Sequence, residues 1–184
     1  MAELYRQAIS ELESVATQID DHAVDRACEM IADARRIGVY GCGREGLQLR
    51  GFAMRLFHLG RDVSVVGDMT MPPLGAGDLF IVSAGPGYLS TAMALATVAR
   101  DAGAKVLLLT AQPAGRIAAL ADHVLVIPAQ TMADDRGPAR RSLLPMGSVF
   151  EGALFVLFEV MVLKLQKRLH ITLDAMRANH TNME

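Results

Sequence analysis

Two polar side chains near the end of the sequence, Glu151 and His180, are of the types that proton transfer requires. Glu151 comes where a long apolar segment begins, so its carboxylate belongs to the first turn of a predicted buried helix. His180 opens a short tail, residues 180–184, that has few apolar side chains to pack into a core. A carboxylate and an imidazole can shuttle protons between neighbouring carbons. The pair therefore favours an enzyme.

Two further segments carry groups that suit an anion. Residues 41–46 read Gly-Cys-Gly-Arg-Glu-Gly, and residues 83–91 read Ser-Ala-Gly-Pro-Gly-Tyr-Leu-Ser-Thr. Each follows an apolar run and enters a helical pattern, where free backbone N–H groups and hydroxyls can bind a phosphate. We expect the substrate-binding residues to be Gly43, Arg44, Glu45, Ser83, Gly85, Gly87, Ser90 and Thr91.

The glycine segment 41–46 has other interpretations. It matches the G-x-G-x-x-G pattern of dinucleotide-binding folds, and Asp68 follows the second apolar run, where an acid would contact a ribose. However, only one such unit occurs, and the bulky Arg44 and Glu45 would obstruct a pyrophosphate. We therefore expect no nucleotide cofactor. The glycines could also serve only a tight turn, and Ser90 could be a plain helix N-cap.

Composition excludes several classes of protein. The 184 residues carry a formal charge of -2, which leaves no excess of cations for binding nucleic acid. The two cysteines form neither a disulfide framework nor a CxxC metal site, so we expect no metal and a reducing cytoplasm. No signal peptide is recognisable, and the longest apolar stretch, residues 152–163, contains a glutamate and is shorter than the roughly 20 residues of a membrane span.

Apolar periodicity predicts the elements that must position these residues. The first 35 residues form two amphipathic helical patterns, and five short apolar runs follow. Continuous apolar runs that alternate with helical patterns are typical of parallel strands covered on both faces. We predict an α/β three-layer sandwich with a doubly wound, five-stranded parallel sheet of the flavodoxin-like kind. The strands are expected at residues 37–40, 63–66, 79–82, 106–109 and 123–128.

We expect one domain over residues 1–184, because the chain is short for two cores. It would comprise N-terminal helices (1–35), an α/β core (36–129), a loop (130–146) and C-terminal helices with a tail (147–184). The loop contains five charged residues around Gly137 and Pro138, so it should be solvated, with an active-site lid as the alternative. Thr172 is the expected N-cap of the last helix.

Several stretches together carry a family resemblance: residues 41–44, 52–60, 66–72, 145–151 and 180–184. On these motifs the chain resembles the sugar isomerase (SIS) domain and, within it, the 6-phospho-3-hexuloisomerases of the ribulose monophosphate pathway. The resemblance covers nearly the whole chain. It implies that 3-hexulose 6-phosphate and fructose 6-phosphate are interconverted through an enediol, without metal or nucleotide.

The resemblance also implies an assembly. In such isomerases the site is shared between subunits, with a glutamate on a helix and a histidine from a neighbouring chain. Glu151 and His180 match those positions. The family forms tetramers, so the resemblance implies a homotetramer with shared sites.

The chain departs from the family at its phosphate-binding loops. Glu45 stands where a serine is usual, and Pro86 replaces a second serine, with Tyr88 and Leu89 in place of Glu-Thr. A carboxylate facing a phosphate costs on the order of 1 to 4 kcal/mol, unless Glu45 turns away to pair with Arg44 or Arg50. Two alternatives to the isomerase therefore stay open: a non-catalytic sugar or sugar-phosphate sensor, and an isomerase of a different sugar.

Overall fold

The computed structural model of the chain describes residues 1–183, so Glu184, the last residue of the tail motif, lies outside it. Five parallel strands form one sheet in the order β2-β1-β3-β4-β5, which is the flavodoxin-like, doubly wound order. Each strand is a short apolar run, and β3 is buried along its whole length, as expected for a sheet covered on both faces. This confirms the predicted fold. The strands are β1 (Ile37–Gly41), β2 (Val63–Val65), β3 (Leu79–Ser83), β4 (Lys105–Thr110) and β5 (His123–Val126).

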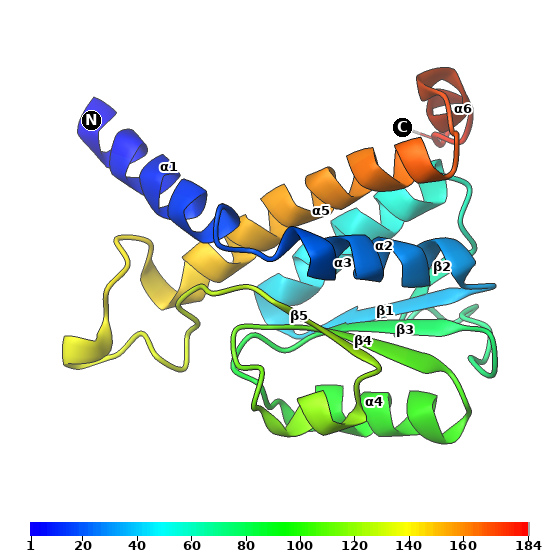
Figure 1. Cartoon of the computed structure of the whole chain (residues 1–184), viewed down its shortest axis with the longest axis horizontal. Coiled ribbons are helices and arrows are strands. Elements are labelled where there is room, and N and C mark those ends of the chain that lie inside the picture. Colours follow the sequence, from blue (N-terminus) through cyan, green and yellow to red (C-terminus); the bar gives the residue numbers. More distant parts are fainter. Residues whose placement is uncertain (184) are drawn as a thin grey trace.

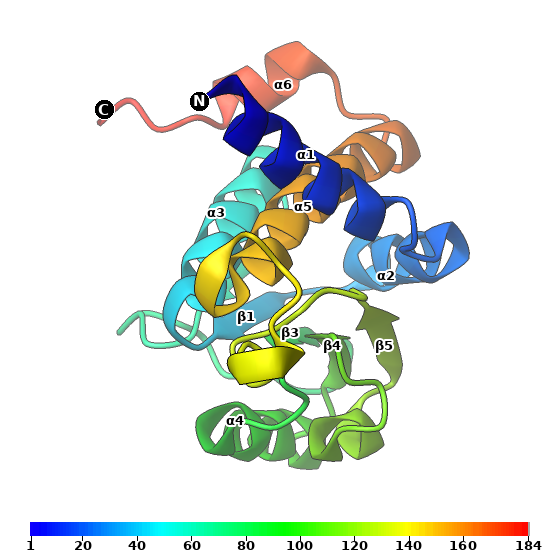
Figure 2. The ribbon, with the colours of Figure 1, turned by 90° about the vertical axis from the view of Figure 1, so that its left-hand side faces the viewer.

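Helices cover both faces of the sheet (Figures 1 and 2). Helices α2 and α3 lie on one face, and α4 with the short 3-10 helix η1 lies on the other. Helix α5 packs over α2 and α3, and α1 crosses α5 on its outer side. The α-helices are α1 (Ala2–Ala16), α2 (Asp21–Asp33), α3 (Gly43–His58), α4 (Ser90–Asp101), α5 (Ser148–Arg168) and α6 (Leu173–Ala178). The 3-10 helices are η1 (Arg116–Leu120), η2 (Gly137–Ala139) and η3 (Pro145–Gly147).

Helix α5 is a core helix. Its apolar residues lie on all sides of the helix, which is typical of a buried element. Phe158 stacks on Phe52 of α3 with ring centroids 4.2 Å apart, and Glu159 accepts two hydrogen bonds from Arg55 of α3, each 3.1 Å long. Within residues 1–183 it is the one helix that, with the preceding turn, has the length and apolar composition to cross a membrane. Half of its most apolar window is buried inside the protein.

The turn from β1 into α3 depends on two glycines that touch. A Cβ at Gly46 would lie 2.4 Å from the carbonyl oxygen of Gly41, and a Cβ at Gly41 would lie 2.9 Å from the nitrogen of Gly46. Only glycine permits so close an approach of two backbones. The tight turn directs Arg44 and Glu45, in the first turn of α3, toward the carboxyl edge of the sheet.

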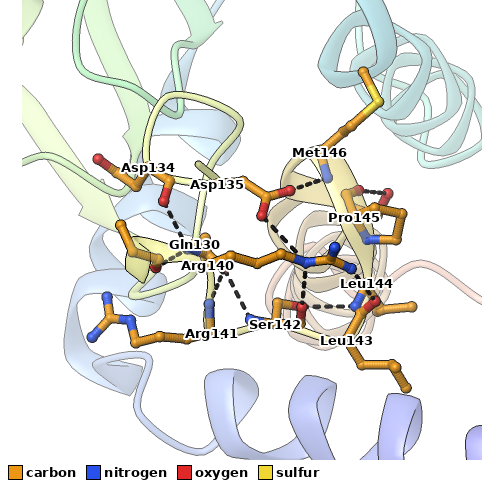
Figure 3. Close-up of polar contacts among 12 residues, drawn as sticks. Gln130, Asp134, Asp135, Arg140, Arg141, Ser142, Leu143, Leu144, Pro145 and Met146 are labelled. Atoms are coloured by element: carbon orange, nitrogen blue, oxygen red, sulfur yellow. Dashed lines mark hydrogen bonds and ion pairs between the residues drawn. The ribbon is translucent and has the colours of Figure 1, made fainter. Parts of the chain in front are cut away.

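The segment 130–146 has little regular structure, but its own side chains hold it together (Figure 3). The amide nitrogen of Gln130 donates to the carbonyls of Asp134 (2.9 Å) and Ala139 (2.8 Å). The amide oxygen of Gln130 accepts from the backbone N–H groups of Arg141 (3.0 Å) and Ser142 (2.9 Å). One side chain therefore holds several turns of the segment together, while most of its residues are exposed to solvent, as expected from the sequence.

The same segment is also tied to its neighbours. The carboxylate of Asp135, only 5% exposed, accepts a hydrogen bond from the backbone N–H of Met146 and lies 3.6 Å from Arg140 (Figure 3). Glu11 of α1 accepts a hydrogen bond from the hydroxyl of Ser142 at 2.5 Å. The N-terminal helix thus contacts the loop, although most of its apolar surface stays exposed.

Candidate active site

A cavity of about 540 Å³ lies at the carboxyl edge of the sheet. Parallel sheets bind ligands at this edge, and the loops after β1 and β3, which contain the expected binding residues, reach the cavity. The first turn of α3, the loop after β3, the segment 131–136 and the start of α5 enclose it. The lining residues are Cys42, Gly43, Arg44, Glu45, Pro86, Tyr88, Leu89, Thr131, Met132, Ala133, Arg136, Gly147, Phe150 and Glu151.

Glu151 faces this cavity from the first turn of α5, with a side chain that is 15% exposed. Its carboxylate lies 3.2 Å from the guanidinium of Arg44. Burial raises the pKa of Glu151 above its ordinary value, Arg44 opposes that shift, and the nearby Glu45 adds to it. A carboxylate whose pKa is raised toward the working pH can both remove a proton and return it.

Arg44 joins α3 to the beginning of α5. Besides Glu151, its guanidinium donates to the hydroxyl of Ser148 at 2.9 Å and to the carbonyl oxygen of Met146. Gly147, the N-cap of α5, has a φ of +78°, and a Cβ there would lie 2.5 Å from the nitrogen of Met132. The contact fixes the cavity-lining loop against the helix that carries Glu151.

Glu45 does not turn away to pair with Arg44 or Arg50. Strands β1 and β3 run side by side with Gly41 opposite Ser83, so the first turn of α3 lies beside the end of β3. The carboxylate of Glu45 accepts hydrogen bonds from the hydroxyl of Ser83 (2.5 Å) and from the backbone N–H of Gly85 (3.1 Å). Burial raises its pKa, and these two bonds oppose that shift.

The other expected binding residues divide between the cavity and its surroundings. Gly43 lines the cavity, whereas Ser83 and Gly85 contact Glu45. Gly87, Ser90 and Thr91 are not among the residues that line the cavity within the described chain. A Cβ at Gly87 would lie 2.7 Å from Gln112, so this glycine serves packing.

The sequence-based N-cap at Ser90 is wrong by one position. Helix α4 begins at Ser90, and Leu89 occupies the N-cap with no side-chain hydrogen bond. The expectation for Thr172 is confirmed, since its hydroxyl accepts a hydrogen bond from the backbone N–H of Ala175 at 3.1 Å.

His180 does not lie with Glu151 in the same chain. Its ring stacks on His58 at the carboxyl end of α3, with centroids 5.2 Å apart, whereas Glu151 contacts Arg44 at the opposite end of that helix. Arg44 and His58 are 14 positions apart in α3, which corresponds to roughly 21 Å along the helix axis. Helix α6 and the tail likewise lie at the end of α5 that is remote from its first turn (Figure 1).

Sequence reasoning gave the segment 130–146 a place at the active site only as an alternative, and it named none of its residues as a binding residue. Thr131, Met132, Ala133 and Arg136 line the cavity. The available signals were the lapse of apolar periodicity and the cluster of charged residues. Both are equally typical of a loop exposed to solvent and of a loop that lines a cavity. No group of three His, Cys, Asp or Glu side chains is arranged to hold a metal ion within residues 1–183.

Comparisons with known proteins identify the family of the chain. The SIS domain model matches residues 30–154. A 3-hexulose-6-phosphate isomerase of Bacillus subtilis is 31% identical over 182 residues, covering 99% of this chain and 98% of the relative. The corresponding enzyme of Mycobacterium gastri is 36% identical and covers 95% of this chain and 86% of the relative.

A solved structure is similar over the whole chain. It is that of a Methanococcus jannaschii protein with an inferred 3-hexulose-6-phosphate isomerase function, and it is 25% identical with a TM-score of 0.82. The alignment covers 100% of this chain and 98% of that protein. The family model covers the sheet and the beginning of α5, where Glu151 lies, and these relatives extend over nearly the whole chain. The chain therefore belongs to the SIS phosphosugar isomerase family.

Proposed function

We propose that the protein interconverts 3-hexulose 6-phosphate and fructose 6-phosphate, with Glu151 as the group that moves the carbon-bound proton. The observation that carries the proposal is the half-buried Glu151 carboxylate, paired with Arg44 in a cavity large enough for an open-chain sugar. Relatives of that name, similar over nearly the full chain, support the choice of substrate. A cytoplasmic location is part of the proposal and is supported by the free thiols of Cys28 and Cys42.

The reaction moves a carbonyl from carbon 3 to carbon 2 of the sugar. Glu151 removes the proton on carbon 2, the electrons of that C–H bond form an enediolate across carbons 2 and 3, and the protonated Glu151 returns the proton to carbon 3. Another proton passes between the two oxygens, so no external oxidant is consumed. Arg44, 3.2 Å from Glu151, steadies the carboxylate and offers positive charge where the enediolate develops.

In this proposal His180 of a neighbouring subunit moves the proton between the two oxygens. The distance between His180 and Glu151 within one chain supports a shared site. A second support is apolar surface on α3 and α5, where Leu47, Met54 and Phe155 are 65%, 49% and 59% exposed. A patch of this kind is typical of a subunit interface. A homotetramer stays the expected assembly.

The test is a Glu151→Gln variant, which removes the base and keeps the shape. Turnover should fall by roughly 10²- to 10⁴-fold, while binding of fructose 6-phosphate stays nearly unchanged. Deuterium incorporation into fructose 6-phosphate in deuterated water measures the proton transfer directly. Glu159→Gln, two turns further along α5 and outside the cavity lining, is the matched control and should retain exchange. Full exchange by Glu151→Gln would exclude the proposed role.

A second candidate is a sugar sensor that binds without converting its ligand, or an isomerase of a different sugar. The observation that favours these alternatives is the position of Glu45. Its carboxylate accepts hydrogen bonds from the Ser83 hydroxyl and the Gly85 N–H, two donors that could otherwise bind a phosphate. Saturable binding of fructose 6-phosphate with no deuterium exchange would support the sensor. Exchange on a sugar other than fructose 6-phosphate would support the other isomerase.

A further inference from the structure

The cavity contains an anion of its own. We propose that the Glu45 carboxylate takes the place that a phosphate would have in the loops after β1 and β3, and that the phosphate of the substrate binds Arg136 instead. The inference rests on the proposed function, because it assigns a binding residue for a phosphosugar in the same cavity.

Two donors at the end of β3 are already used. Ser83, with 0% of its surface exposed, donates its hydroxyl hydrogen to Glu45 at 2.5 Å, and the backbone N–H of Gly85 donates to the same carboxylate. Glu45 reaches them from the first turn of α3, where backbone N–H groups favour a negative group. A phosphate would have to displace this carboxylate and would be repelled by it wherever it is ionised.

Arg44 is also engaged. Its guanidinium contacts Glu151, the hydroxyl of Ser148 and the carbonyl oxygen of Met146, all at the start of α5. Rotating it toward a phosphate would break these contacts and leave Glu151 without its cation. Arg44 therefore belongs to the proton-transfer group rather than to the phosphate site.

Arg136 is the second arginine that lines the cavity. Within the described residues its guanidinium makes no hydrogen bond and no ion pair, so all of its donors are available to a ligand. A guanidinium can donate two parallel hydrogen bonds to a phosphate. It is the cation that remains for this task once Arg44 is assigned to Glu151.

The backbone around Arg136 is fixed. The preceding Asp135 accepts a hydrogen bond from Met146 and pairs with Arg140, and the 3-10 helix η2 follows directly (Figure 3). Thr131 donates to the carboxylate of Asp134 at 3.2 Å. The backbone at position 136 is thus held in place, so binding a ligand would have to order only the side chain of Arg136.

The experiment measures binding of fructose 6-phosphate, inorganic phosphate and fructose by isothermal titration calorimetry, so that turnover is not needed. Arg136→Ala should weaken the binding of fructose 6-phosphate and of phosphate by about 10- to 100-fold, and it should leave the affinity for fructose within about 2-fold of the original. Arg141→Ala, an exposed arginine of the same loop outside the cavity lining, is the control and should change none of them. Unchanged binding of both phosphate compounds by Arg136→Ala would overturn the inference.

A double variant tests the part played by Glu45. Glu45→Ser frees the Ser83 hydroxyl and the Gly85 N–H, so Glu45→Ser/Arg136→Ala should regain phosphate binding that Arg136→Ala alone lacks. No recovery in a folded double variant would overturn the assignment of that place to Glu45. Absence of any phosphate or fructose 6-phosphate binding by the unmodified protein would overturn the inference as a whole.

The two proposals fail separately. If Glu151→Gln abolishes deuterium exchange but Arg136→Ala binds fructose 6-phosphate normally, the isomerase stands and the phosphate assignment is wrong. If Arg136→Ala loses binding while the unmodified protein shows no exchange, the phosphate assignment stands and the isomerase is wrong.

Discussion

The contact between Gly41 and Gly46 makes a strong prediction about stability and about the site. A Gly46→Ala substitution adds a methyl group that would lie 2.4 Å from the carbonyl oxygen and 3.1 Å from the carbonyl carbon of Gly41. Both atoms belong to the backbone, so no side chain can move aside. Strand β1 and helix α3 must separate, and the separation carries Arg44 and Glu45 with it.

The expected loss follows from two opposing terms. Forcing extra volume into a closely packed contact costs about 3 kcal/mol at the upper end of its usual range. Alanine in a helix recovers up to about 1 kcal/mol relative to glycine. The free energy of unfolding should therefore fall by about 2 kcal/mol, which for a chain of this length lowers Tm by about 4 to 8 °C.

Gly51→Ala is the matched control. Gly51 lies in the same helix, and a Cβ there would have no atom within 4 Å. With no close contact, only the helix propensity acts, and the free energy of unfolding should rise by about 0.5 to 1 kcal/mol. The same chemical change thus has opposite effects at two positions of α3.

Thermal and urea denaturation of both variants measure these differences. Deuterium exchange at a temperature where both are folded should also be weaker in Gly46→Ala than in Gly51→Ala, because only the first shifts the cavity. Equal stability of the two variants, or a Gly46→Ala protein as stable as the original, would refute the close-contact reasoning.

Three further predictions concern charge. Arg44→Ala removes a cation 3.2 Å from Glu151, an interaction worth about 1 kcal/mol even in a water-like dielectric. Because Arg44 lowers the pKa of Glu151, its loss should move the acid limb of the pH–kcat profile to higher pH. An acid limb that stays at the same pH would contradict this. Asp78, fully buried, accepts two 3.0 Å hydrogen bonds from Arg35, so Asp78→Ala should cost about 1.5 to 3 kcal/mol in urea unfolding, and an unchanged midpoint contradicts it. Burial raises the folded-state pKa of Glu45, so its stabilising contribution is complete below the unfolded pKa and is lost as pH rises through the folded pKa. Between these two pKa values, the free energy of unfolding of the unmodified protein should therefore fall relative to that of Glu45→Gln as pH rises. A difference between the two proteins that stays constant with pH would contradict this prediction.

The sheet could be predicted because its signal is local. Runs such as Leu79–Ser83 are apolar at every position, and only a strand covered on both faces buries all of them. Helix α5 was predicted from its continuous apolar sequence and its acid in the first turn. The ends of elements were less certain, as the shift of the α4 N-cap from Ser90 to Leu89 illustrates.

The site was only partly predictable because its contacts join distant segments. Glu151 was found from its place at the start of an apolar helix. The partner of Glu45 could not be found, since it depends on the register that sets Gly41 beside Ser83. Arg136 gave no signal beyond its charge, because a loop without periodicity looks the same whether it faces solvent or a cavity.

The most direct test of the central claim mixes two inactive variants, Glu151→Gln and His180→Ala. If the site combines Glu151 of one subunit with His180 of another, subunit exchange at equal amounts creates hybrids in which one kind of site is complete. About a quarter of the sites, and so about a quarter of the original exchange activity, should return on mixing. Mixtures that form hybrids, verified by mass spectrometry, yet stay as inactive as their parents would contradict the claim.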